Sequence, residues 1–205
     1  MHPIVITGTD TGIGKTVFAA GLAAAIGATY WKPIQSGLDG EASDSETAIR
    51  LGVRNVLPEA YRLTEPLSPH RAAELDGISI DPARLTLPEA RGRLIIEGAG
   101  GLLVPVTRNL LYADLFARWA VPVVLVARTA LGTINHSLLS IEAMRRRGLT
   151  ILGIAFVGDA NEDNEATIAA LGAVKRLGRL PRLDPLEADR LGAAFAANFR
   201  TEDFL

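Results

Sequence analysis

Short apolar runs alternate with longer segments of helical character along most of the chain. The runs that predict buried strands are residues 4–7, 29–31, 94–96, 122–126, 151–157 and 176–180. The segments that predict helices are residues 15–26, 44–51, 69–75, 111–119, 134–147, 162–171 and 186–198. Strands that are apolar throughout must be covered on both faces, so the sheet is expected to be largely parallel. The pattern therefore predicts a doubly wound α/β fold with helices on both faces, in a single domain spanning residues 1–205.

Two predicted helices carry signals for their ends. Ser43, with Glu46 three residues later, predicts a capping box at the start of residues 44–51. Thr133 is expected to cap the helix that follows it. Residues 35–92 contain five prolines, at positions 58, 66, 69, 82 and 88, and are therefore expected to be rich in loops. We interpret residues 51–93 as a wall and lid beside the site.

Composition removes several classes of function. The chain has 21 basic and 23 acidic residues, whereas nucleic-acid-binding domains are usually strongly basic. It has no cysteine, which excludes disulfides, thiolate zinc sites and cysteine nucleophiles. No apolar run approaches the roughly 20 residues of a membrane span, and no basic segment precedes an apolar run near Met1. We therefore expect a cytoplasmic protein that binds neither nucleic acid nor membrane.

The segment from Gly8 to Thr16 carries the strongest chemical signal. The usual phosphate loop is a glycine, four residues, then Gly-Lys-Thr or Gly-Lys-Ser; here Thr9 takes the place of that glycine, and Gly8 lies one residue earlier. The ending Gly14-Lys15-Thr16 is intact, an apolar strand precedes it and a helix follows. Such a loop wraps phosphates with backbone N–H groups, its lysine reaches the β- and γ-phosphates, and its threonine holds Mg²⁺. A fold like that of the P-loop NTPases follows.

Mg²⁺ requires further oxygen ligands, and two carboxylates are candidates. Glu97 directly follows a predicted strand and precedes a glycine-rich turn, although an ordinary acidic residue at a strand end is an equal alternative. Asp44 lies at a helix start, where acidic residues are favoured in any case, so the residues alone favour a structural role. Lys32 alone would more often be a solvated lysine at a strand end.

Taken in order, five segments resemble those of the dethiobiotin synthetase family. They are residues 8–16 (GTDTGIGKT), 31–37 (WKPIQSG), 43–44 (SD), 97–102 (EGAGGL) and 131–136 (LGTINH), and the resemblance extends to about Gly148. It implies a homodimeric enzyme that uses MgATP to close 7,8-diaminopelargonate and CO₂ (or bicarbonate) into dethiobiotin. Lys15 and Lys32 would be its catalytic residues.

The same resemblance implies the other site residues. The Mg²⁺ ligands would be Thr16, Asp44 and Glu97. The nucleotide would contact Gly12, Ile13, Gly14, Lys15, Thr16, Val17, Asp44, Glu97, Gly98, Ala99, Gly100, Val157, Gly158, Pro181, Arg182 and Leu183. The substrate would contact Thr11, Lys32, Ser36, Gly132, Thr133 and Asn135. The free N–H groups of the helix at Thr133 would bind the substrate's carboxylate from the other subunit, although a plain helix start is an equal alternative.

The chain departs from the family at the expected base site. The family's adenine-reading asparagine is missing from the end of the strand at residues 151–157, where the sequence continues Gly158-Asp159, and the next asparagine is Asn161. This departure predicts that adenine selectivity is relaxed or carried by backbone groups.

Two other classes of protein with a phosphate loop fit this sequence less well. Switch ATPases of the partition type, which act by dimerisation and partner binding, usually carry an extra lysine early in the loop, where this chain has Asp10. Amidating enzymes of corrin synthesis typically add a glutaminase domain with a nucleophilic cysteine, and both are missing here. We interpret His2, His70 and His136 as structural or surface residues, because the expected chemistry requires no general-base histidine.

Overall fold

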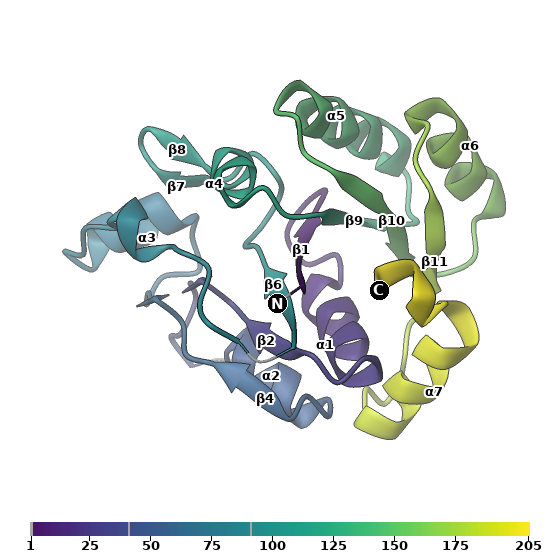
Figure 1. Ribbon diagram of the computed structural model, residues 1–205, viewed down its shortest axis with the longest axis horizontal. Coiled ribbons are helices and arrows are strands. Elements are labelled where there is room, and N and C mark those ends of the chain that lie inside the picture. Colours follow the sequence, from purple (N-terminus) through teal and green to yellow (C-terminus); the bar gives the residue numbers. More distant parts are fainter. Residues whose placement is uncertain (1, 41, 91) are drawn as a thin grey trace.

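The computed structural model describes residues 2–40, 42–90 and 92–205; Met1, part of the N-terminal segment considered above, lies outside them. Within these ranges the central sheet has seven strands, all parallel to their neighbours, in the order β11-β10-β9-β1-β6-β2-β4 (Figure 1). The strands are β1 (His2–Gly8), β2 (Thr29–Trp31), β4 (Asn55–Leu57), β6 (Arg93–Glu97), β9 (Val123–Arg128), β10 (Ile151–Val157) and β11 (Arg176–Leu180). The predicted doubly wound α/β fold is confirmed.

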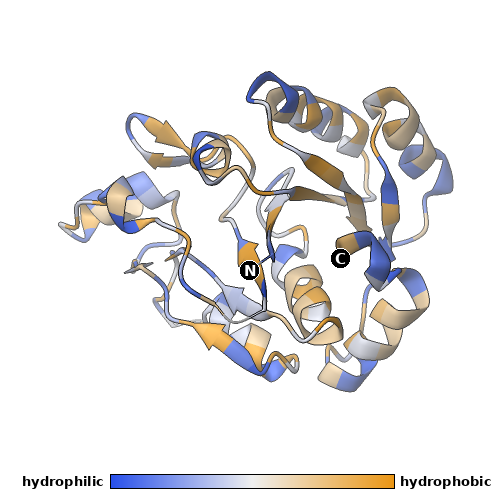
Figure 2. Ribbon diagram, in the orientation of Figure 1, coloured by the Kyte–Doolittle hydropathy of each residue, from blue (hydrophilic) through white to orange (hydrophobic). Residues whose placement is uncertain are grey.

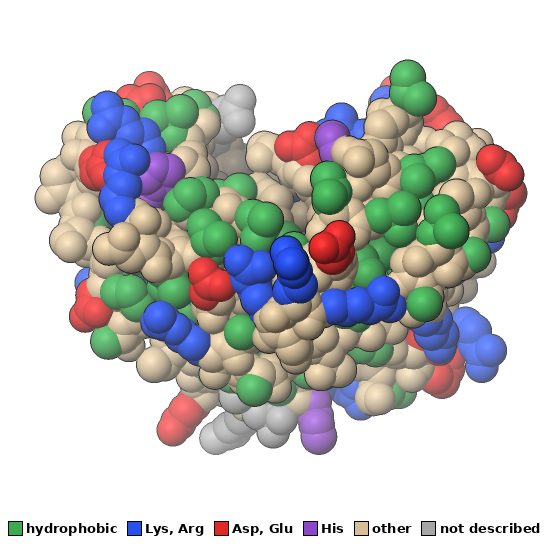
Figure 3. Space-filling model, turned by 90° about the horizontal axis from the view of Figure 1, so that it is seen from above, with side chains coloured by type: hydrophobic (Ala, Val, Ile, Leu, Met, Phe, Trp, Pro, Cys, Tyr) green, Lys and Arg blue, Asp and Glu red, His purple; other side chains and the backbone are tan. Residues whose placement is uncertain are grey.

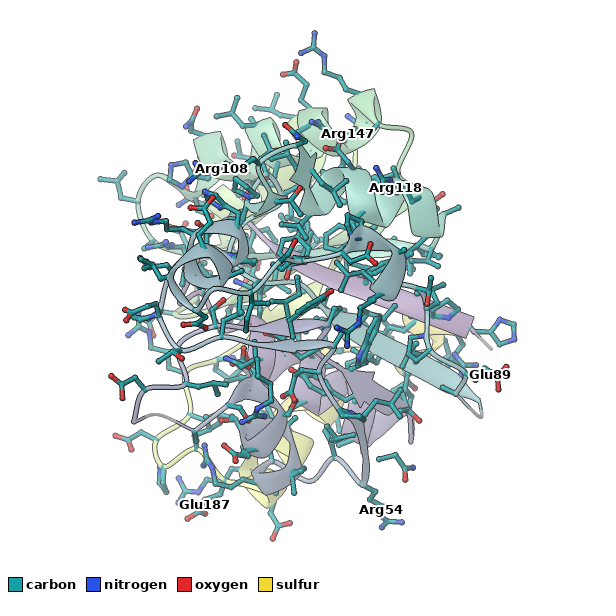
Figure 4. All side chains as sticks on the ribbon, turned by 90° about the vertical axis from the view of Figure 1, so that its left-hand side faces the viewer. Arg54, Glu89, Arg108, Arg118, Arg147 and Glu187 are labelled. Carbon is teal, nitrogen blue, oxygen red and sulfur yellow. The ribbon has the colours of Figure 1, made fainter. Side chains whose placement is uncertain are left out.

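Helices cover both faces of the sheet and enclose two apolar cores. The first face carries α1 (Lys15–Ala25), α2 (Asp44–Arg50) and α7 (Ala188–Asn198), with Phe18 and Phe195 fully buried between helices and strands. The second face carries α4 (Tyr112–Trp119), α5 (Thr133–Arg146) and α6 (Glu162–Gly172). Figure 2 shows the apolar strands between these layers, and Figure 4 shows Arg54, Glu89 and Glu187 pointing outward. Within the described ranges, no helix combines the length and apolarity needed to span a membrane.

The two predicted caps had different outcomes. The capping box of α2 is confirmed: Ser43 Oγ accepts from the Glu46 N–H at 3.1 Å, and Glu46 Oε2 accepts from the Ser43 N–H at 2.8 Å. The prediction that Thr133 caps α5 was wrong. Gly132 is the N-cap, with a left-handed φ of 90° that favours glycine, while the Thr133 hydroxyl donates to the Arg128 carbonyl.

The proline-rich segment is more ordered than its sequence pattern indicated. Besides α3 (Pro69–Leu75), it contains β4 at the sheet edge and the short parallel pair β3 (Ile34–Gln35) and β5 (Tyr61–Arg62). Side chains also fix it: Trp31 Nε1 donates to the Pro58 carbonyl at 3.1 Å, and Trp119 Nε1 donates to the Leu85 carbonyl at 2.8 Å. A hairpin of β7 (Pro105–Thr107) and β8 (Leu110–Leu111) follows β6, and single 3₁₀ turns lie at Pro82–Arg84 and Thr201–Phe204. The strands β3, β4, β5, β7 and β8 have only two or three residues each, which is too short to give a periodic signal.

Topology places the chemistry at the carboxyl ends of the central strands. β1 lies between β6 and β9, and the chain leaves β1 directly into the glycine-rich loop before α1. Ligands of open α/β sheets bind where neighbouring strands lead in opposite directions, at their carboxyl ends. The space-filling view shows a notch in the upper rim of the molecule, between the α3 side and the α5–α6 side (Figure 3).

Candidate active site

The glycine-rich loop is closely packed against its own lysine and against β10. A Cβ added at Gly8 would lie 2.8 Å from Lys15 Cδ, so the glycine one residue early in the motif makes room for the lysine stem. Gly14 has a left-handed φ of 92°, and a Cβ there would lie 2.7 Å from Val157 Cγ1. The backbone conformation at Gly14 therefore requires glycine, and Gly8 leaves the space that the Lys15 stem occupies.

Lys15 is buried against this loop. Its ammonium donates to the Asp10 carbonyl at 2.7 Å, and the residue is 6% exposed. Burial, opposed by the charge of Glu97 and assisted by that of Lys32, lowers the pKa of Lys15 to about 8. An anion arriving at the loop would favour the charged form of this lysine.

Three oxygen-bearing side chains converge at the start of α1. Thr16 Oγ1 lies 2.8 Å from Asp44 Oδ1 and 2.8 Å from Glu97 Oε1. They come from three elements, because Asp44 opens α2 and Glu97 ends β6. A hydroxyl and two carboxylates are the oxygen ligands that Mg²⁺ prefers, so the residues present fit this ion.

Lys32 lies between the two carboxylates. Its ammonium pairs with Asp44 Oδ2, lies 3.0 Å from Glu97 Oε1 and donates to the Gly98 carbonyl at 3.3 Å. Burial disfavours the charge, but Glu97 and Asp44 outweigh it and raise the pKa of Lys32 above its ordinary value. Lys32 also lowers the pKa of Asp44 against the opposing effect of burial. At 3% exposed, Lys32 is not the solvated lysine that is common at strand ends.

Two further residues position this cluster, and neither was predicted from the sequence. Tyr30 OH donates to Glu97 Oε2 at 2.7 Å, and burial followed by the charge of Glu97 raises the pKa of the phenol well above its ordinary value. Gln35 Oε1 accepts from the Asp44 N–H at 2.9 Å, and its Nε2 donates to the Ser36 carbonyl at 2.8 Å. Gln35 lies inside a quoted motif, but Tyr30 looks like any strand residue.

Two cavities flank the loop. One of about 550 Å³ is lined by residues 11, 12 and 14–17 and by Lys32, Ser36, Asp44, Glu97, Ala99 and Gly100. The other, of about 470 Å³, is lined by Gly12, Ile13, Gly14, Val157, Gly158 and Arg182, with Pro181 and Leu183 adjacent to Arg182 in the chain. Gly98 contributes the carbonyl bound by Lys32. The structure thus gathers most of the predicted site residues around one loop.

The predicted substrate residues at the start of α5 lie elsewhere. Among the described residues, the linings of the two cavities do not include Gly132, Thr133 or Asn135. Gly132 and Asn135 are exposed, and Thr133 Oγ1 is occupied by the Arg128 carbonyl at 2.5 Å. Within one copy of the chain, this segment is therefore not part of the lysine-lined cavity.

The smaller cavity has polar side chains, but several of them are already engaged by other protein groups. They are Arg128, Thr129, Asp159, Asn161 and Arg182, and Arg128 pairs with Asp10. Asn161 lines this cavity, but Asn161 Oδ1 accepts from the Asn164 N–H at 3.2 Å and caps α6. Gly158 uses its N–H for the Leu180 carbonyl at 3.0 Å, and its carbonyl accepts from Arg179 Nη1 at 3.4 Å. Arg182 is 79% exposed at its side chain and faces Asp159 across 4.0 Å.

Comparison with solved structures identifies the fold. The cell division ATPase MinD from Pyrococcus furiosus is similar with a TM-score of 0.56 and 15% identity, over 90% of this chain and 85% of that one. A plasmid partition protein from Borrelia burgdorferi is similar with a TM-score of 0.56 and 12% identity, over 96% of each chain. At these identities, the likeness to partition ATPases is one of fold alone.

Comparison of sequences identifies the family. A family model described as an AAA domain matches residues 2–190. A protein named ATP-dependent dethiobiotin synthetase BioD from Sphingopyxis alaskensis is 62% identical over the whole of both chains. Proteins of the same name from Novosphingobium aromaticivorans and Rhodopseudomonas palustris are each 61% identical, over 100% and 99% of this chain and 100% and 96% of theirs. Together with the lysine-lined cavity beside the phosphate loop, these matches show that the chain belongs to the ATP-dependent dethiobiotin synthetase family.

Proposed function

We propose that this protein is an ATP-dependent cyclo-ligase, which forms the ureido ring of dethiobiotin from 7,8-diaminopelargonate and CO₂ and releases ADP and phosphate. One observation carries the proposal: two buried ammonium groups, those of Lys15 and Lys32, face one cavity of about 550 Å³ beside a phosphate loop. The relatives described above are named ATP-dependent dethiobiotin synthetase, which supports the proposal.

The first step joins an amine to CO₂. A free alkylamine has a pKa of about 10.4, and only its neutral form attacks carbon. Burial and the charge of Lys32 lower the pKa of Lys15 in this cavity despite Glu97 and Asp44, and we propose that the same balance lowers the pKa of a bound amine. The new C–N bond then yields a carbamate anion after the nitrogen loses a proton, and the same two lysines stabilise that anion.

The second step transfers the γ-phosphoryl group of ATP to a carbamate oxygen. Phosphoryl transfer depends mainly on positioning and on compensation of charge. We propose that Lys15 contacts the β- and γ-phosphates and that Lys32 lies beside the oxygen that attacks. Thr16, Asp44 and Glu97 would hold Mg²⁺, which, when bound, offsets part of the negative charge of the triphosphate.

The third step closes the ring. The second amine attacks the carbonyl carbon of the carbamic–phosphoric anhydride, the bond from that carbon to the phosphate oxygen breaks, and the amine loses its proton. Backbone N–H groups of the loop and the two lysines would stabilise the departing phosphate. Phosphate is a good leaving group, so no histidine is required.

The remaining predicted residues complete this site. We propose that the base occupies the smaller cavity and contacts Val157, Gly158, Pro181, Arg182 and Leu183. The start of α5, with Gly132, Thr133 and Asn135, would bind the substrate's carboxylate in a second copy of the chain. This arrangement requires a homodimer and is supported by the exposure of Gly132 and Asn135 within one copy. We further propose that the enzyme acts in the cytoplasm.

An omission assay tests the function. Phosphate release is measured with ATP, bicarbonate and 7,8-diaminopelargonate, each left out in turn, and we expect release only when all three are present. Phosphate release that does not depend on the diamine would favour a switch ATPase.

Lys15→Ala should lower turnover roughly a hundredfold, equivalent to about 3 kcal/mol of transition-state stabilisation. Unchanged turnover in that variant would contradict the role of Lys15.

A further inference from the structure

Both carboxylate oxygens of Glu97 are occupied, each by a different kind of partner. Oε1 lies 2.8 Å from Thr16 Oγ1 and 3.0 Å from Lys32 Nζ, on the side of the larger cavity. Oε2 accepts from Tyr30 OH at 2.7 Å, on the side of the core. Glu97 and Tyr30 are 1% and 0% exposed, so water does not compete effectively for this hydrogen bond.

The register of the sheet explains how Tyr30 reaches Glu97. β2 and β6 are adjacent and parallel, with Tyr30 opposite Ile95. Glu97 lies two residues beyond Ile95, and residues two apart in a strand face the same side of a sheet. The Tyr30 ring packs in the core beneath α1, together with Ile6 and Ile95, and its hydroxyl extends toward the end of β6. Lys32 follows two residues after Tyr30 and meets the other oxygen of the same carboxylate.

We propose that Tyr30 is a positioning residue, which locks the rotation of the Glu97 carboxylate so that Oε1 alone is presented to the Mg²⁺ of the nucleotide complex. This inference rests on the proposed function. A glutamate side chain can rotate about its last bond. Its two oxygens are chemically equivalent, so a half-turn changes nothing, but a partial rotation would turn both oxygens toward the cavity. The Tyr30 hydroxyl prevents this partial rotation, because it donates to Oε2 on the side of the core.

Hydrogen-bond partners of metal-ligating side chains affect metal binding by a known amount. Removal of such a partner typically lowers metal affinity or activity by about ten- to hundredfold. Tyr30→Phe removes only the hydroxyl and keeps the ring in the core. We expect the apparent Mg²⁺ requirement of the ligase reaction to rise by about tenfold or more, while the KM for the diamine is unchanged.

A binding measurement provides a readout besides activity. The affinity of the protein for ADP is measured by calorimetry with Mg²⁺ and with EDTA. In Tyr30→Phe, the strengthening of ADP binding by Mg²⁺ should shrink by about tenfold, while binding of ADP alone is unchanged. Wild-type protein that binds no MgADP would overturn this inference together with the proposed function. Wild-type protein that binds MgADP but forms no dethiobiotin would overturn the proposed function alone.

A second buried tyrosine serves as the matched control. Tyr61 is 5% exposed and its hydroxyl accepts from the Asp81 N–H at 2.9 Å, and neither residue is among the described residues that line the two cavities. Tyr61→Phe should lower the melting temperature and leave the Mg²⁺ dependence unchanged. If Tyr30→Phe behaves in the same way, Tyr30 is merely structural and the inference is overturned.

A double-mutant cycle completes the test. If Tyr30 acts through Glu97, its hydroxyl should matter only while the carboxylate is present. In a Glu97→Gln background, Tyr30→Phe should therefore cause less than a twofold further change in the Mg²⁺ dependence of ADP binding. A full additional tenfold loss would show that Tyr30 acts by another route and would overturn the inference.

Discussion

Glu97 and Glu165 are equally buried, at 1% and 0% exposed, yet they serve different parts of the molecule. Glu97 ends β6, where a hydroxyl, an ammonium and a phenol meet it at the edge of the larger cavity. Glu165 lies in α6 and is held by two arginines of β11, with Arg176 Nη2 at 2.5 Å and Arg179 Nε at 3.1 Å.

The difference between them lies in what else their partners can reach. Lys32 and Thr16 line a cavity together with Glu97, so a ligand can share the charges of that cluster. Among the described residues, neither cavity lining includes Glu165, Arg176 or Arg179. A buried ion pair therefore marks a site only where some of its polar atoms face a cavity; elsewhere it joins secondary-structure elements, here α6 and β11.

The largest effect should come from removing the cation beside Glu97. Lys32→Ala takes away an ammonium at the reacting groups and leaves two carboxylates without it. We expect turnover to fall by about a thousandfold, equivalent to about 4 kcal/mol. The affinity for ADP should survive, because the phosphates are expected to contact the loop rather than Lys32.

Steady-state turnover and calorimetry with ADP check this prediction. Lys175→Ala is the control, since that lysine is 55% exposed and pairs with Asp203 at 2.7 Å on the surface. It should change turnover less than twofold. Loss of ADP affinity in Lys32→Ala, with an unchanged single-turnover rate, would instead assign Lys32 to nucleotide binding.

A smaller effect, on stability rather than turnover, should follow from neutralising Glu165. Breaking a fully buried pair costs about 3–5 kcal/mol, but the Arg176 side chain is 34% exposed and can regain water. Glu165→Gln should therefore lower the free energy of unfolding by about 2 kcal/mol, measured by urea denaturation. Glu162→Gln is the control, because Glu162 is 65% exposed and pairs with the same arginine; it should cost less than about 0.5 kcal/mol. Equal losses in both variants would contradict a special role for the buried residue.

The region around Glu97 was largely predictable from sequence. Phosphate binding requires glycines, a lysine and a hydroxyl at fixed spacing, so the loop from Gly8 to Thr16 can be recognised from its own short sequence. The parallel sheet was also predictable, because its central strands are apolar without interruption. The family resemblance then indicated site roles for Asp44 and Lys32, whose local sequence alone favours a structural aspartate at a helix start and a solvated lysine at a strand end.

What the sequence did not reveal depends on contacts between distant segments. Tyr30 and Glu97 are 67 positions apart, and their hydrogen bond requires β2 and β6 to be neighbours in the sheet. β4 is a short edge strand without a continuous apolar run. The prediction that Thr133 caps α5 was wrong because threonine and glycine both occur as N-caps. Only the backbone conformation shows that Gly132 takes this position.

The smallest effect should come from the helix caps beside the two glutamates. Ser43 caps α2, whose first residue is Asp44, and Asn161 caps α6, which carries Glu165. Each replacement by alanine should lower the free energy of unfolding by about 1 kcal/mol. Only Ser43→Ala should also raise the Mg²⁺ requirement of the reaction, because only there does the first helical turn hold a proposed Mg²⁺ ligand. Asn161→Ala should instead raise the KM for ATP, since Asn161 lines the smaller cavity. Thermal unfolding and titrations of Mg²⁺ and ATP separate the two variants, and identical kinetic changes in both would mean that the two glutamate regions do not act independently.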